Sequence, residues 1–176
     1  MSDLTTEVEA IIRNVPDFPK PGIQFKDITP LLSDSELLAK VIAHFHDHYA
    51  SKKIDVIVGV ESRGFLFGIP LALSLGVPFV PARKKGKLPA DKIEYSYDLE
   101  YGSATLEMHR DAITAGQRVV IIDDLLATGG TANATGQLVQ QLGGEVASFA
   151  FVIELGFLNG RQAIGDCDVL SLINYS

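Results

Sequence analysis

The segment VVIIDDLLATGGT, residues 119–131, is the part of this 176-residue chain that most clearly indicates its fold class. Its first four residues are apolar and β-branched, which is typical of a strand buried on both faces of a parallel sheet. Asp123 and Asp124 follow, at the carboxyl end of that strand, where open α/β sheets bind their ligands. The segment therefore predicts an α/β fold with a binding site after this strand. The alternative is a solvated Asp-Asp turn before an ordinary helix.

The glycine-rich end of the segment predicts a phosphate site. Gly129 and Gly130 allow positive φ, so successive backbone N–H groups can point at one anion, and Thr128 and Thr131 add hydroxyl donors. The spacing of the apolar residues that follow predicts a helix over 131–142, whose amino end attracts negative charge. A phosphate suits this position.

The adjacent carboxylates indicate what else the ligand carries. Asp123 and Asp124 would repel a phosphate directly, so we expect them to accept hydrogen bonds from nearby hydroxyl groups. The vicinal hydroxyls of a ribose meet this requirement, and the predicted ligand is therefore a sugar phosphate. A nucleoside-triphosphate P-loop is a weaker alternative, because GxxxxGK[ST] needs a lysine that this loop lacks.

Composition narrows the class of protein. A chain with 47% hydrophobic and 21% charged residues fits one globular domain, and we expect a single domain over 1–176. The formal net charge of −7 argues against a nucleic acid or an anionic membrane as partner. Cys167 is the single cysteine, and the first residues lack the basic region of a secretory signal. We therefore expect a cytoplasmic protein.

Periodicity and breaker residues predict alternating helices and strands, with the Pro-rich segment 16–30 extended over the surface. An alternating aromatic and polar pattern predicts a hairpin over 93–108. Pro70 leaves open whether its helix starts later or is kinked. The predicted helices cover 4–13, 35–49, 64–75 and 131–142, and the predicted strands cover 54–60, 77–81, 119–122, 146–153 and 168–173.

Two further groups of residues suit anions. Glu61-Ser62-Arg63 follows a predicted buried strand, where amides and a guanidinium can bind a second anionic group, although an Arg–Glu surface pair is the alternative. The run 83–87 contains four cations in a Gly-containing loop, which attracts phosphates but is equally typical of a solvated surface. His44, His46 and His48 alternate within a predicted helix and show no zinc-ligand spacing.

Residues 119–132 closely resemble the phosphoribosyl-diphosphate motif of the type I phosphoribosyltransferases. Other motifs narrow the resemblance to the members that use adenine, and together they run over nearly the whole chain in the family's order. These motifs are FPKPGIQFKDIT (18–29), ESRGF (61–65), RKKGKLP (83–89) and LEYG (99–102).

The resemblance implies a type I phosphoribosyltransferase fold: a central, mainly parallel sheet flanked by helices, with a small hood over residues 1–34 and a flexible hairpin loop. It implies a purine salvage enzyme that transfers the 5-phosphoribosyl group from phosphoribosyl diphosphate (PRPP) to adenine, forming AMP and diphosphate. It also implies Mg²⁺ bound with PRPP rather than by direct protein ligands, and a homodimer in which Arg83 or Lys84 reaches the neighbouring subunit.

The same resemblance assigns roles to numbered residues. Glu100 and Tyr101 are the implied catalytic pair, and Asp123 and Asp124 bind the ribose hydroxyls. The 5-phosphate lies on the loop formed by Ala127, Thr128, Gly129, Gly130 and Thr131, and the diphosphate is bound by Glu61, Ser62, Arg63, Arg83, Lys84 and Lys87. Adenine is bound by Gln24, Phe25, Lys26 and Leu155.

Three alternatives stay open at this point. By composition alone, Phe25 and Leu155 are more typical of ordinary core than of a base site, and Lys26 stands where many members have Arg, which loses bidentate geometry. A transferase for a 6-oxopurine would need a side-chain donor, and no clear candidate follows the strand 146–153. A ligand-sensing regulator would usually carry an added nucleic-acid-binding domain, for which this acidic chain has no room.

Overall fold

The computed structural model of this chain describes residues 3–98 and 102–176. The chain forms two compact units, Met1–Phe45 and His46–Ser176, and each is described by itself. In the described residues no helix is long and apolar enough to span a membrane.

The first unit contains helices and a two-stranded hairpin. Its elements are α1 (Leu4–Ile11), β1 (Arg13–Pro16), β2 (Gln24–Asp27), α2 (Thr29–Ser33) and most of α3 (Ser35–Tyr49). β1 and β2 pair antiparallel, so the Pro-rich segment that we predicted to be simply extended is partly a strand pair. The turn between them is held by the Asp17 carboxylate, which accepts a hydrogen bond from the Gly22 N–H at 2.8 Å. The predicted helix 35–49 is confirmed.

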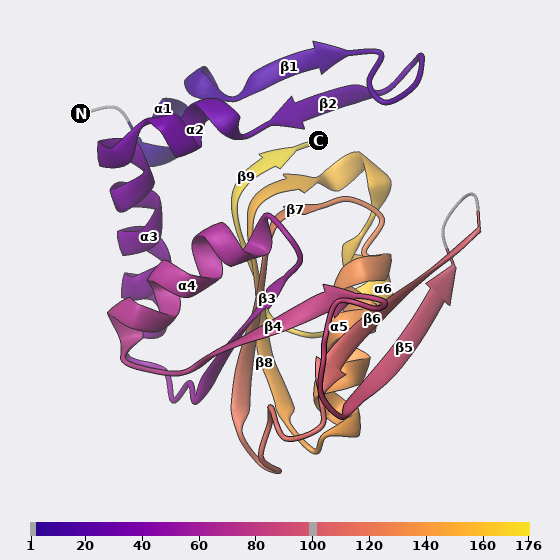
Figure 1. Cartoon of the computed structure of the whole chain (residues 1–176). Coiled ribbons are helices and arrows are strands. Elements are labelled where there is room, and N and C mark those ends of the chain that lie inside the picture. Colours follow the sequence, from indigo (N-terminus) through magenta and orange to yellow (C-terminus); the bar gives the residue numbers. More distant parts are fainter. Residues whose placement is uncertain (1–2, 99–101) are drawn as a thin grey trace. The chain divides into compact units, whose positions relative to one another are not determined.

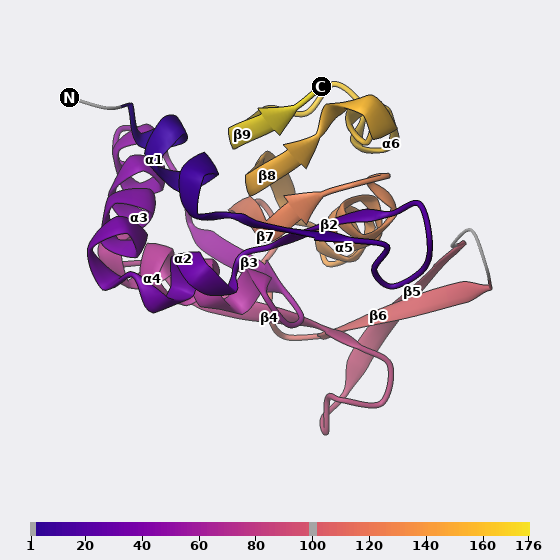
Figure 2. The same cartoon turned by 90° about the horizontal axis from the view of Figure 1, so that it is seen from above.

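The second unit is built on a seven-stranded sheet of order β5-β6-β4-β3-β7-β8-β9, which Figures 1 and 2 show from two directions. The five strands from β4 to β9 in this order are parallel, and the β5–β6 hairpin adds an antiparallel edge through β4. The predicted α/β fold with a mainly parallel sheet is confirmed. The strands are β3 (Val56–Val60), β4 (Phe79–Lys84), β5 (Lys92–Asp98), β6 (Ser103–His109), β7 (Arg118–Leu126), β8 (Glu145–Leu155) and β9 (Val169–Tyr175).

Helices α4 (Gly64–Leu75) and α5 (Gly130–Gln141) lie on opposite faces of this sheet (Figure 1). Gly68 lets α4 approach closely, because a Cβ there would lie 2.7 Å from the Phe79 ring and 3.0 Å from the Ile122 side chain. A 3₁₀ turn, η1 (Gly156–Leu158), and the short α6 (Arg161–Ile164) follow β8; the sequence pattern predicted neither. Because helices cover both faces of the sheet, β3 and β7 are buried on both sides, and their sequences are apolar runs rather than alternating patterns.

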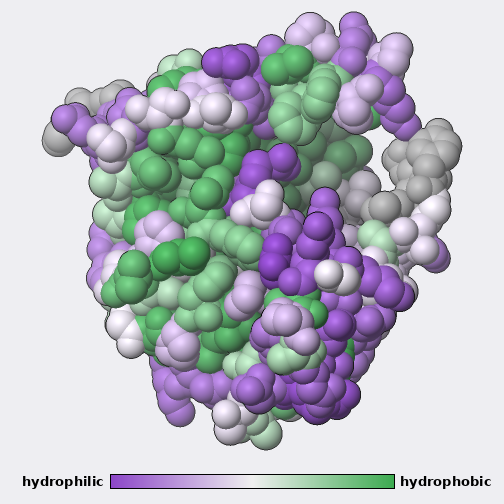
Figure 3. Space-filling view, viewed as in Figure 1, coloured by the Kyte–Doolittle hydropathy of each residue, from purple (hydrophilic) through white to green (hydrophobic). Residues whose placement is uncertain are grey.

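α4 differs from an ordinary surface helix. Pro70 lies inside this helix, which begins at Gly64, so of the two alternatives the later start is not observed. Leu66, Ile69 and Leu73 are exposed on its outer side at helical spacing, and Figure 3 shows a hydrophobic area over this helix. Contiguous exposed apolar residues of this kind are typical of binding surfaces.

β7 is longer than the predicted strand 119–122. It continues to Leu126, and β8 pairs with it beyond the predicted end, with Asp123 opposite Phe151 and Leu125 opposite Ile153. The two acids therefore lie within the strand and not after it. The apolar-run signal ends at Ile122, and only the pairing with β8 extends the strand further.

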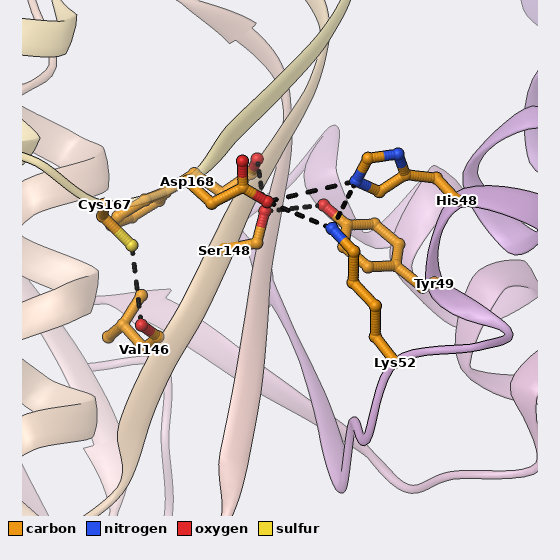
Figure 4. Close-up of polar contacts among 8 residues, drawn as sticks. His48, Tyr49, Lys52, Val146, Ser148, Cys167 and Asp168 are labelled. Atoms are coloured by element: carbon orange, nitrogen blue, oxygen red, sulfur yellow. Dashed lines mark hydrogen bonds and ion pairs between the residues drawn. The ribbon is translucent and has the colours of Figure 1, made fainter.

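A polar cluster joins the last turn of α3 to β8 and to the residue before β9 (Figure 4). The Tyr49 hydroxyl lies 2.9 Å from Ser148 Oγ, both side chains are buried, and burial raises the pKa of the Tyr49 phenol. Asp168 lies 3.3 Å from Lys52 Nζ and 4.0 Å from His48 Nε2. Burial alone would raise the pKa of Asp168, but the Lys52 ammonium lowers it below its usual value.

We predict that Tyr49→Phe lowers the free energy of unfolding by about 1 kcal/mol, because it removes a buried hydrogen bond and leaves the ring in place. Urea denaturation followed by circular dichroism measures the change. Ser148→Ala is the matched variant, and the double variant should lose less than the sum of the two single losses. Additive losses would show that the two hydroxyls do not depend on each other.

Candidate active site

A cavity of about 300 Å³ opens at the carboxyl ends of β3 and β7. It is lined by the loop after β3, the end of β4, the end of β5 and the continuous segment from Asp123 to Ala132. Ligand sites of open α/β sheets lie at this edge. Most of the residues predicted to bind PRPP thus come together, and those in the lining are Glu61, Ser62, Arg63, Lys84, Asp123, Asp124, Ala127, Thr128, Gly129, Gly130 and Thr131.

The segment Ala127–Thr131 forms the turn between β7 and α5. Gly129 is the N-cap with φ +84°, and the first intrahelical bond is donated by the Asn133 N–H to the Gly129 carbonyl at 2.9 Å. Amides earlier in the first turn have no carbonyl partner within the helix, and together with the helix dipole they favour an anion. This geometry matches the predicted phosphate loop.

Gly160 supports this turn by a close backbone approach. A Cβ on Gly129 would lie 2.2 Å from the Gly160 carbonyl oxygen, and a Cβ on Gly160 would lie 2.2 Å from the Ala127 carbonyl oxygen. No other amino acid fits at either position without moving the backbone. Gly160 is buried before α6, and sequence reasoning missed it because its partner is more than thirty residues away.

The two carboxylates have different environments. Asp124 is 3% exposed and its Oδ2 lies 2.5 Å from Arg63 Nε, and its backbone N–H donates to Asp123 Oδ1 at 2.8 Å. Burial raises the pKa of Asp123 well above its usual value, and the neighbouring charge of Asp124 raises it further. Keeping both acids ionised at this edge costs free energy, which hydrogen-bond donors from a ligand would offset.

Glu61 holds two of the predicted diphosphate-binding residues. Its Oε1 accepts a hydrogen bond from Arg83 Nη2 at 3.0 Å and its Oε2 accepts one from the Lys84 backbone N–H at 2.9 Å. The Arg83 guanidinium lowers the pKa of Glu61. Arg83 Nη1 donates to the Lys87 carbonyl at 3.0 Å, and neither Arg83 nor Lys87 belongs to the cavity lining.

Glu107 on β6 accepts hydrogen bonds from the basic turn, the loop that contains the cations of residues 83–87. Its carboxylate is 1% exposed and accepts hydrogen bonds from the Gly86 N–H at 2.8 Å and the Leu88 N–H at 3.4 Å, with Lys92 Nζ 3.9 Å away. Burial alone would raise its pKa, yet these backbone donors and Lys92 hold the pKa below its ordinary value. Sequence reasoning missed Glu107, because an acid in an alternating strand reads as a solvent-facing residue.

The residues predicted to bind adenine lie in different units. Gln24, Phe25 and Lys26 belong to β2 in the first unit, where the Phe25 ring packs edge-on against Phe18 with centroids 5.1 Å apart. Lys26 Nζ donates to Asn14 Oδ1 at 2.6 Å. Leu155 is the last residue of β8 in the second unit and is half-buried.

The predicted catalytic pair and one further tyrosine belong, in sequence, to the region of the β5–β6 hairpin. Glu100 and Tyr101, the predicted catalytic pair, lie outside the described residues. Tyr97, which we had placed only in the hairpin pattern, lines the cavity, and its hydroxyl lies 2.9 Å from Thr131 Oγ1. Nothing in a single sequence distinguishes Tyr97 from the other aromatic residues of that strand.

Comparison with known proteins agrees with this geometry. The model of the phosphoribosyl transferase domain matches residues 30–170. The adenine phosphoribosyltransferase of Acidobacterium capsulatum is 57% identical over 96% of this chain and 93% of the relative. The crystal structure of adenine phosphoribosyltransferase from Thermoanaerobacter pseudethanolicus superposes with a TM-score of 0.94 at 53% identity, over 97% of this chain and 99% of that chain.

A Saccharomyces cerevisiae adenine phosphoribosyltransferase, solved in complex with adenine and an imino-altritol bisphosphate, has a TM-score of 0.90 at 44% identity, over 96% of this chain and 98% of that chain. The fold and the cavity define a phosphoribosyltransferase. The chain belongs to this family, in the branch of the adenine phosphoribosyltransferases, and the family predicted from the motifs is confirmed.

We predict that Asp123→Asn stabilises the protein without ligand and that the gain depends on pH. Because the pKa of Asp123 is raised on folding, the folded state is penalised increasingly as pH rises above the carboxyl's unfolded pKa, and Asn removes that penalty. We expect Tm to rise by roughly 2–4 °C at pH 8, the shift for about 1 kcal/mol at this length, and by less at pH 5. Differential scanning calorimetry at both pH values measures this; an equal shift at both would contradict the argument.

Proposed function

We propose that this chain transfers the 5-phosphoribosyl group of PRPP to N9 of adenine and releases AMP and diphosphate. The observation that carries this proposal is one cavity that joins the amino end of α5 to the carboxylate pair Asp123 and Asp124. A phosphate on a sugar needs both features at once. Relatives at more than half identity are named for adenine as acceptor, which agrees with the proposed base.

The proposed binding of the donor follows from the contacts in the cavity. The 5-phosphate accepts hydrogen bonds from the turn Ala127–Thr131, and the ribose hydroxyls donate to Asp123 and Asp124. Ser62 and Arg63 bind the diphosphate, joined by Lys84 from the end of β4. Arg63 is paired with Asp124 before the donor arrives, so its guanidinium can bridge the sugar end and the diphosphate end of the site.

Glu61 has a different part in this proposal from the one first expected. Its two carboxylate oxygens are occupied by Arg83 and by the Lys84 backbone N–H, and a bare carboxylate would repel diphosphate. We therefore propose that Glu61 aligns the cations. Arg83 and Lys87 contribute positive potential from beside the cavity, and in a dimer Arg83 or Lys84 would reach the partner's site.

Magnesium fits this site as an ion that arrives with the substrate. In residues 3–98 and 102–176 no group of three His, Cys, Asp or Glu side chains could hold a metal ion. When PRPP binds with its ion, Asp123 and Asp124 would accept hydrogen bonds from the ribose hydroxyls and so orient the donor that carries the Mg²⁺. When bound, Mg²⁺ neutralises charge that develops on the departing diphosphate. The protein contributes positioning, electrostatic stabilisation and exclusion of water.

The proposed base site uses the first unit. Phe25 stacks on adenine, with Leu155 on its other face, and main-chain groups near Gln24 and Arg63 read the base edge; Lys26 retains the positive charge that many members carry as Arg. A 6-amino donor is selected by backbone acceptors, which a 6-oxo group would leave without partners. Residues 1–34 contribute this hood to a single domain, and Glu100 manages the proton of the purine imidazole while Tyr101 closes the site.

A homodimer in the cytoplasm completes the proposal. The exposed apolar stripe Leu66, Ile69 and Leu73 on α4 suits a second copy of the chain, because a two-fold contact between such stripes buries both. α4 begins directly after the loop that carries Ser62 and Arg63, so a contact along this helix would bring the partner close to the site.

An assay with adenine, PRPP and Mg²⁺ tests the reaction. We expect equal amounts of AMP and diphosphate, and little product with hypoxanthine or guanine. Asp123→Asn combined with Asp124→Asn should lower kcat/KM by roughly 100-fold or more, because two charge-assisted hydrogen bonds to the ribose are lost. Product only from 6-oxopurines would overturn the choice of base, and tight PRPP binding without diphosphate release would favour the regulator.

The dimer has its own test. Leu73→Glu places a charge at the most exposed position of the stripe, 77% exposed, and should convert a dimer into a monomer in light scattering at micromolar concentration. Gln140→Glu adds the same charge to the exposed side of α5 and should leave the dimer intact. A Leu73→Glu protein that stays dimeric would place the interface elsewhere.

A further inference from the structure

Tyr97 connects the β5–β6 hairpin to the phosphate loop. Its hydroxyl oxygen lies 2.9 Å from Thr131 Oγ1, and it belongs to the lining of the cavity. Its ring also packs on the backbone of the loop, since a Cβ added to Gly130 would lie 3.3 Å from Tyr97 Cδ2. Two separate contacts thus fix the same side chain against the first turn of α5, beside which β5 runs in Figure 1.

We propose that Tyr97 is a positioning residue that orients the Thr131 hydroxyl as a hydrogen-bond donor to the 5-phosphate of PRPP. This inference rests on the proposed function, because it takes the turn Ala127–Thr131 as the 5-phosphate site. It adds a residue from the hairpin to a site otherwise formed by β7 and α5.

The direction of the hydrogen bond follows from the chemistry of the phosphate. Either hydroxyl can donate while the site is empty. The oxygens of a phosphate dianion only accept, so a bound 5-phosphate requires the Thr131 hydrogen. Thr131 Oγ1 then offers its lone pairs, and the Tyr97 hydroxyl donates to one of them. Each donor in such a chain polarises the next, which strengthens the contact with the phosphate.

Without Tyr97 the Thr131 hydroxyl would lose its fixed orientation. A threonine hydroxyl near a helix start can turn toward neighbouring backbone groups, and it must then be reoriented when the ligand binds. Losing the Tyr97 hydroxyl removes the contribution of one neutral hydrogen bond, which corresponds to about fivefold in the affinity for the phosphate. The backbone amides of the loop are untouched, so the phosphate site is weakened but not abolished.

Tyr97→Phe removes the hydroxyl and retains the ring. Titration calorimetry with ribose 5-phosphate, which carries the phosphate but no diphosphate, should show about fivefold weaker binding to the variant. The affinity for PRPP should fall by the same factor. Inorganic diphosphate, which does not use the 5-phosphate site, should bind unchanged. In the assay the KM for PRPP should rise while the KM for adenine and Tm stay the same, a pattern that general loss of structure would not give.

Tyr95→Phe is the matched control. Tyr95 lies two residues earlier on the same strand and therefore on the same face, but it is not in the cavity lining. The Tyr95→Phe protein should bind ribose 5-phosphate with the affinity of the wild type. A control that weakened binding as much as Tyr97→Phe would assign the effect to the hairpin in general and overturn the proposal.

A double-mutant cycle identifies the route of the effect. Thr131→Val removes the hydroxyl between Tyr97 and the phosphate, so Tyr97→Phe should have no further effect in that background. Independent, additive losses would overturn the role of Thr131. Wild-type protein that binds neither ribose 5-phosphate nor PRPP would refute the proposed function itself, whereas wild-type binding with unchanged Tyr97→Phe would refute only this inference.

Discussion

The structure depends on placing two carboxylates at the end of a strand that is buried on both faces. β7 runs through the centre of the parallel sheet and carries Asp123 and Asp124 to its edge, where α5 begins four residues after Leu126. Burial disfavours the charge of Asp123, and the neighbouring Asp124 is hydrogen-bonded to the Arg63 guanidinium. The carboxylate pair therefore costs free energy in the protein without ligand, and the proposed binding of the ribose hydroxyls would offset that cost.

Around this pair, two acids whose carboxylates are hydrogen-bonded within the protein hold the basic segment in place. Glu61 binds Arg83 and the Lys84 amide, and Glu107 accepts hydrogen bonds from the amides of the basic turn. Both carboxyl pKa values are lowered, so the acids stay ionised and keep their partners in place near neutral pH. An acidic chain can thus present a local group of cations, such as the proposed diphosphate site needs, because part of its negative charge fixes the geometry of those cations.

Local sequence predicted what depends on local chemistry. The apolar runs of β3 and β7, the glycine turn at Gly129 and the helix over 35–49 are confirmed, because each depends on neighbouring residues alone. The extension of β7 through the acids depends on pairing with β8, and the roles of Glu107, Tyr97 and Gly160 depend on contacts between distant segments. Contacts between distant segments produce no periodic pattern in a single sequence. The family resemblance indicated ligand-binding positions, but it did not indicate the three residues that support them.

The close approach of Gly129 and Gly160 couples two positions that are distant in the sequence. A methyl group on Gly129 would meet the Gly160 carbonyl, and one on Gly160 would meet the Ala127 carbonyl, so neither substitution can be accommodated by moving a side chain. A designer who wants to enlarge the phosphate loop for a bulkier donor must therefore rebuild the connection after β8 at the same time. Sequence libraries confined to residues 127–131 would leave the constraint on Gly129 in place.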